Sequence, residues 1–98
     1  MTNTDSHRDW MRRLHGNAVV DAHRHSSRHR AEIEASDRCG CFYCMRVFSR
    51  EQIEEWTDDG DTALCPHCGI DSVLGSASGY EISAPFLSQM YGAWFLAQ

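Results

Sequence analysis

Five cysteines are the residues of this 98-residue chain whose spacing most clearly implies chemistry. Four of them form two C-x2-C pairs, Cys41 with Cys44 and Cys65 with Cys68, and twenty residues separate the pairs. A tight turn between two cysteines aims both thiolates at one point, so each pair can fill two corners of a tetrahedron. The spacing therefore predicts one Zn²⁺ held by Cys41, Cys44, Cys65 and Cys68.

The remaining cysteine and the N-terminal sequence argue against a disulfide framework. The cysteine count is odd, and the first twenty residues contain charged side chains but no apolar stretch typical of a signal peptide. We therefore expect a cytoplasmic protein. Cys39 can replace Cys41 as a ligand, pack as a small apolar side chain, or act as a reactive thiol, and packing is the commonest outcome. His67, inside the second pair, is expected to face solvent.

The residues around the two pairs resemble known zinc-binding families. Residues 65–69, Cys-Pro-His-Cys-Gly, look like the C-P-x-C-G knuckle of zinc-ribbon and rubredoxin-like proteins, and residues 41–48 are similar to the first knuckle and strand of small zinc fingers. This resemblance implies a zinc-ribbon-like, treble-clef-related fold. Met45, where rubredoxin has glycine, makes iron the lesser interpretation. The wider chain also resembles a family of short, uncharacterised bacterial and phage cytoplasmic proteins, which implies size and location only.

A second stretch, residues 23–30, carries three arginines, three histidines, two serines and no acid. Our candidate contacts to a phosphate or carboxylate are His25, Ser26, Ser27, Arg28, His29 and Arg30. On a continuous helix the two histidines four residues apart would face one side, and serines at a helix start can present hydroxyls and free amides to an anion. The alternative is structural: one serine caps a helix, one histidine packs, and the arginines pair with Glu32 and Glu34.

These features favour a non-enzymatic zinc-binding protein with a structural site of four cysteines. It would recognise a partner protein or an anionic ligand through residues 23–30, which we call the arginine–histidine segment, and would act as a host or phage regulatory factor. A shell of four cysteines leaves no coordination position for water, which argues against zinc hydrolysis. We therefore assign no catalytic residue.

The rival hypothesis is a small enzyme that uses His25 and His29 as acid–base or phosphate-contact groups. A pocket bringing these histidines beside Asp71, Ser72 or residues 75–79 would favour it. Nucleic-acid binding ranks third, because the basic stretch is short and the formal net charge of the chain is −5.

Helices and short strands of an α+β domain must position these groups. Capping residues and apolar spacing predict helices over about residues 5–15, 27–35 and 50–57, and a further helical turn that Asn17 can cap and that carries Val19, Val20 and Ala22. The helix over 50–57 rests on Ser49 and Gln52, which have the spacing of a capping box. Residues 62–64 are predicted to form a short strand, and the small residues 75–79 a loop.

The C-terminal residues predict an amphipathic helix that begins near Pro85, a residue favoured in the first turn. Its broad apolar face comprises Phe86, Leu87, Met90, Tyr91, Trp94 and Phe95. We expect this face to pack on the zinc module, although its aromatic residues would also suit a homodimer or partner interface.

A chain of this length has room for one core, so we expect one globular unit in three parts. These are a helical arm over residues 1–38, a zinc-binding core over 39–80 and the amphipathic helix over 81–98. No apolar run is long enough to cross a bilayer, so we expect no membrane partner.

Overall fold

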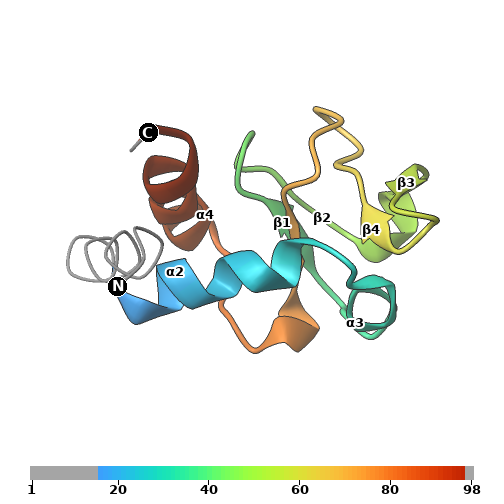
Figure 1. Ribbon diagram of the computed structural model, residues 1–98, viewed down its shortest axis with the longest axis horizontal. Coiled ribbons are helices and arrows are strands. Elements are labelled where there is room, and N and C mark those ends of the chain that lie inside the picture. The colour runs from blue at the N-terminus through green and yellow to red at the C-terminus, as the bar shows by residue number, and fades with distance from the viewer. Residues whose placement is uncertain (1–15, 97–98) are drawn as a thin grey trace, which may run out of the picture.

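A three-stranded antiparallel sheet in the order β2–β1–β5 organises the fold, which a computed structural model describes for residues 16–96 (Figure 1). Strand β1 (Cys39–Cys41) lies in the centre, between β2 (Val47–Phe48) and β5 (Val73–Gly75). Gly40 is opposite Val47 on one side and Leu74 on the other. The first cysteine pair therefore lies in the connection between β1 and β2, at one end of the sheet.

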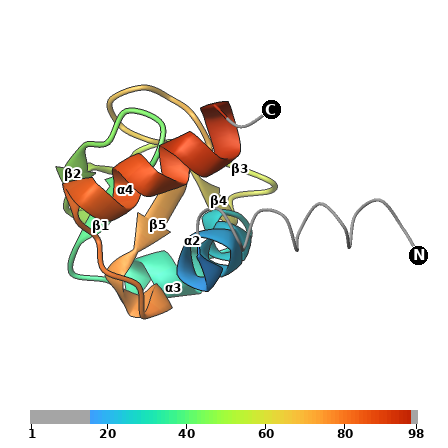
Figure 2. The same ribbon diagram turned by 90° about the vertical axis from the view of Figure 1, so that its left-hand side faces the viewer.

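Two helices lie side by side next to this sheet (Figures 1 and 2). Helix α2 (Asn17–Ala22) continues into a 3-10 turn, η1 (His23–Ser26), and helix α4 (Ala84–Tyr91) continues into a π turn, η4 (Gly92–Leu96). Ser83 caps α4 by accepting the Phe86 N–H at 3.4 Å. The C-terminal helix predicted from the sequence is thus confirmed.

Helix α4 packs directly on the backbone of the central strand. A Cβ atom at Gly40 would lie 2.8 Å from Leu87 Cδ1 and 2.9 Å from Ile82 Cγ2, so a larger residue would force these side chains to shift. The apolar cluster on this side of the sheet comprises Val19, Val20, Ala22, Phe42, Leu74, Ile82, Leu87, Met90 and Ala93. Much of the apolar face of α4 is therefore used inside the chain.

The other apolar cluster lies around the cysteines. Its buried members are Ile33, Cys39, Cys41, Phe48, Ile53, Ala63, Cys65 and Val73. Helix α3 (Arg30–Glu34) and the two-stranded sheet of β3 (Trp56–Thr57) and β4 (Thr62–Ala63) contribute to this half (Figure 1). Strand β4 agrees with the strand predicted for this part of the chain.

The helix predicted over residues 50–57 is wrong. Residues Arg50–Gln52 form a single 3-10 turn, η2, Ser49 makes no capping hydrogen bond, and Trp56–Thr57 form strand β3. Trp56 pairs with Ala63, and its ring lies under the guanidinium of Arg30. Contacts distant in sequence therefore override a local helix signal.

The remaining differences are smaller. Helix α3 begins at Arg30, later than expected, and neither Ser26 nor Ser27 caps it. The predicted loop over 75–79 contains a 3-10 turn, η3 (Ser76–Ser78). The predicted helix over 5–15 lies outside the described residues. Between residues 16 and 96, no helix is long and apolar enough to span a membrane.

Candidate metal centre

The two cysteine pairs lie in knuckles, residues 41–46 and 65–70, that share one backbone hydrogen-bond pattern. In the first knuckle the Met45 N–H donates to the Cys41 carbonyl at 2.8 Å, and in the second the Gly69 N–H donates to the Cys65 carbonyl at 2.9 Å. The N–H of each leading cysteine also donates, at 3.0 Å, to the carbonyl five residues further on. Two different sequences therefore form the same turn.

The fifth position of each knuckle needs a left-handed backbone. Gly69 has φ 78°, which glycine adopts without steric cost, whereas Met45 has φ 62° at the equivalent place. A side chain with a Cβ atom is disfavoured there by about 1–2 kcal/mol. Methionine at position 45 therefore keeps the turn intact but strains its backbone.

The knuckles bring all four predicted ligands together. Their Sγ atoms lie within 4.8 Å of one another, with 3.6 Å between Cys41 and Cys68 and 3.7 Å between Cys44 and Cys65. A tetrahedral site with Zn–S bonds of about 2.3 Å has sulfur–sulfur edges of about 3.8 Å. The four sulfurs therefore fit a metal ion, and the all-sulfur donor set suits zinc or iron.

Several hydrogen-bonding groups converge on the Cys41 sulfur. The N–H groups of Tyr43 and Cys44 point at its sulfur, at 3.3 and 3.5 Å. The hydroxyl of Ser72, which is buried, lies 3.1 Å from the same sulfur. Such contacts hold the orientation of the sulfur, as outer-shell partners of metal ligands do.

Cys65 has a similar environment in the second knuckle. Burial acts to raise the pKa of its thiol, but hydrogen bonds from the backbone N–H groups of Cys68 and His67, together with those to the Cys44 and Cys68 thiols, lower it. The His67 N–H lies 3.3 Å from the Cys65 sulfur. Cys41 and Cys65 are buried, whereas Cys44 and Cys68 are partly exposed, so the sulfur cluster has one side that faces solvent.

The other two residues near the cluster take structural positions. Cys39 is fully buried among apolar neighbours, and burial raises the pKa of its thiol to about 11. Its packing agrees with the commonest expectation for this cysteine. His67 is exposed, with its ring edge-on to Phe48 and its Nδ1 3.4 Å from an Arg46 guanidinium nitrogen.

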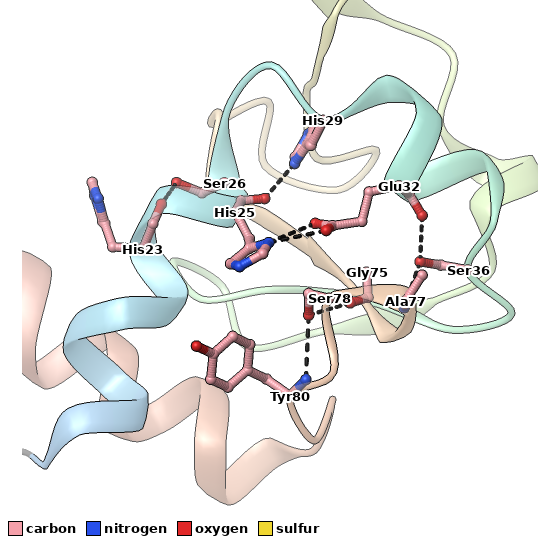
Figure 3. A network of polar contacts seen from close by, with 10 residues as sticks. All are labelled: His23, His25, Ser26, His29, Glu32, Ser36, Gly75, Ala77, Ser78 and Tyr80. Carbon is pink, nitrogen blue, oxygen red and sulfur yellow. Dashed lines mark hydrogen bonds and ion pairs between the residues drawn. The ribbon is translucent and has the colours of Figure 1, made fainter.

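The histidines of the arginine–histidine segment have partners within the chain (Figure 3). His25 Nδ1 lies 2.9 Å from a Glu32 carboxylate oxygen. His29 is 5% exposed, and both of its ring nitrogens are used: Nδ1 donates to the His25 carbonyl at 2.5 Å, and Nε2 accepts the Ala63 N–H at 3.1 Å. Burial lowers the pKa of His29, so the neutral tautomer with a proton on Nδ1 fits this site.

The arginines and serines of the segment point in different directions. Arg30 forms an ion pair with Glu34 at 3.2 Å and donates to the Gly60 carbonyl at 2.8 Å. The buried hydroxyl of Ser26 donates to the His23 carbonyl at 2.6 Å. The side chains of Ser27 and Arg28 are exposed.

The structure therefore does not gather the six candidate contacts on one surface. His29 lies in the core, His25 faces Glu32, and Arg30 packs over the β3–β4 hairpin. A cleft of about 430 Å³ does bring a histidine beside Asp71 and Ser72, but that histidine is His23.

Sequence reasoning missed His23 because its ring partner is distant along the chain. The ring stacks on Trp94, with 3.9 Å between the ring centroids, and no local spacing signals that contact. No family model, curated protein or solved structure matches this chain.

Proposed function

We propose that this chain is a non-catalytic Zn²⁺-binding protein whose four-cysteine site has a structural role and is related to zinc-ribbon knuckles. The sulfur geometry carries the proposal: four Sγ atoms from two matching knuckles lie within 4.8 Å of one another. A complete shell of four thiolates leaves no coordination position for water or substrate. The metal would therefore hold the fold together rather than take part in a reaction.

The position of the knuckles explains why a metal would stabilise the domain. The first knuckle connects β1 to β2, and the second lies between β4 and β5, so one ion would join the central sheet to the β3–β4 hairpin. Structural zinc contributes on the order of 10 kcal/mol, which is comparable with the whole folding free energy of a small domain. Reduced thiolates also suit the cytoplasmic setting that belongs to this proposal.

The proposal keeps a recognition role for the exposed part of the arginine–histidine segment. Arg24 and Arg28 have exposed side chains and make no ion pair within residues 16–96, whereas Arg30 is held by Glu34 and Gly60. A guanidinium at such a position can contact a carboxylate or phosphate on a partner protein. Inorganic phosphate is the simplest probe, and it should shift the NMR resonances of Arg24 and Arg28. Arg28→Gln should reduce the shift that phosphate causes at Arg24. Arg30→Gln should leave the shifts at Arg24 and Arg28 unchanged.

Native mass spectrometry of the protein purified from cells tests the metal directly. We expect one zinc ion per chain, its loss in Cys44→Ser and Cys68→Ser, and its retention in Cys39→Ser. The last variant is the matched control, because it removes a neighbouring thiol that lies outside the cluster. A metal-free wild-type chain that is folded, or a Cys39→Ser variant that loses its metal, would contradict the proposal.

A further inference from the structure

The cleft beside the first knuckle has a wall of four aromatic rings that the metal site does not use. His23 stacks on Trp94 at 3.9 Å, lies 6.1 Å from Phe42, and Phe42 lies 5.8 Å from Phe95, all between ring centroids. The Trp94 indole N–H donates to the Val19 carbonyl at 3.1 Å, which fixes the edge of this wall. Figure 3 shows that His23 points away from the cluster formed by His25, Glu32 and Tyr80.

Four polar residues complete the lining of the cleft, and two of them have partners within the chain. The Ser26 hydroxyl donates to the His23 carbonyl, and the Ser72 hydroxyl lies 3.1 Å from the Cys41 sulfur. The side chains of Ser27 and Asp71 are exposed. A ligand in the cleft would thus meet one hydroxyl and one carboxylate beside the rings.

The charged groups that line the cleft favour a positively charged ligand. Asp71 is the carboxylate among the lining residues, and no arginine lines the cleft. Partial burial lowers the pKa of His23, although Asp71 acts to raise it, and the lowered pKa favours the neutral imidazole. A cleft of about 430 Å³ with this lining has the size and the mixed apolar and polar character of a small-molecule site.

We propose that this cleft binds a small organic cation of the alkylammonium class, held between the aromatic wall and the Asp71 carboxylate. Electron-rich ring faces attract an alkylated ammonium, and a carboxylate at the edge adds a direct charge contact. This binding function is separate from the metal site and from anion recognition by the exposed arginines. The occupant is a free small molecule, because the concave volume suits a compact ligand.

NMR titration of the metal-loaded chain with choline tests the proposal. Its neutral isostere 3,3-dimethylbutan-1-ol has nearly the same shape without the charge. Choline at millimolar concentrations should shift the Trp94 indole N–H and the amides of Ser27 and Asp71, and the isostere should bind at least fivefold more weakly. Equal binding of the two molecules, or no shifts with choline, would overturn the proposal.

Two matched variants locate the charge contact. Asp71→Asn should weaken choline binding at least fivefold, whereas Asp59→Asn, at another exposed acid, should leave it unchanged. Both acids are exposed, so neither change removes packing. Phe95→Leu is a second, independent test, because it removes one aromatic ring from the wall of the cleft. It should also weaken choline binding. Undiminished binding in Asp71→Asn, or shifts confined to residues outside the cleft, would refute the assignment.

Discussion

His29 provides the sharpest test of the internal packing, because its buried ring joins two parts of the chain. Nδ1 donates to the His25 carbonyl and Nε2 accepts the Ala63 N–H of strand β4. His29→Ala would leave the part-buried His25 carbonyl and the buried Ala63 N–H unpaired, at about 1–3 kcal/mol for each group. We therefore expect the unfolding free energy of the metal-loaded chain to fall by roughly 2–6 kcal/mol, a large part of the total for such a domain.

The same geometry predicts a pH dependence of stability. A protonated His29 would place an N–H of the ring against the Ala63 N–H, and burial already lowers the pKa of the ring below 6.5. The unfolded chain therefore binds this proton more readily than the folded chain does. The contribution of neutral His29 is fully present above pH 6.5 and is lost as the pH falls from there toward the lowered pKa. His23, whose pKa is also lowered, contributes with the same sign.

Urea unfolding between about pH 5.5 and 7.5 measures this effect, with bound metal quantified at each pH so that thiolate protonation is recognised separately. His29→Gln should reduce the pH slope of the unfolding free energy. His67→Gln, at an exposed ring, is the matched control for the loss of one imidazole. A slope that persists undiminished in His29→Gln, or a cost below about 0.5 kcal/mol in His29→Ala, would refute the role assigned to this ring.

Four further substitutions test the backbone and the packing around the site. Met45→Gly should raise the unfolding free energy by about 0.5–1 kcal/mol, and Gly69→Ala should lower it by about 1 kcal/mol, because both positions have positive φ. Changes of equal sign for the two variants in thermal unfolding would contradict this. Gly75→Ala should cost roughly 1–3 kcal/mol in chemical unfolding, since its Cβ atom would overlap the Ser36 hydroxyl, and a neutral outcome would disprove that close approach. Cys39→Ser should keep one metal ion per chain while losing about 1–3 kcal/mol of stability through a buried hydroxyl, as metal analysis combined with urea unfolding would reveal.

The features predictable from the sequence are those with a local signature. Two C-x2-C pairs carry their own turn geometry, so the cluster of Cys41, Cys44, Cys65 and Cys68 follows from spacing alone. The start of α4 is equally local, because the capping serine and the proline stand within one turn of each other.

The features that escaped prediction depend on contacts between distant parts of the chain. The capping signal at Ser49 fails because Trp56 pairs with Ala63 in a small sheet and receives Arg30 on its ring. His29 looks like a ligand in the sequence, and its acceptor role becomes visible only when β4 lies beside it. For residues 23–30 the sequence leaves an anion site and a structural role open, and the packing of His29 against Ala63 and the ion pair of Arg30 with Glu34 agree with the structural role for these two residues.

X-ray absorption spectroscopy at the zinc edge, on the protein as purified from cells, reports the metal and its ligands together. We expect one zinc ion coordinated by four sulfur atoms at about 2.3 Å, with no nitrogen or oxygen in its shell. A nitrogen ligand, an open position filled by water, or a folded chain that contains no zinc would contradict this expectation.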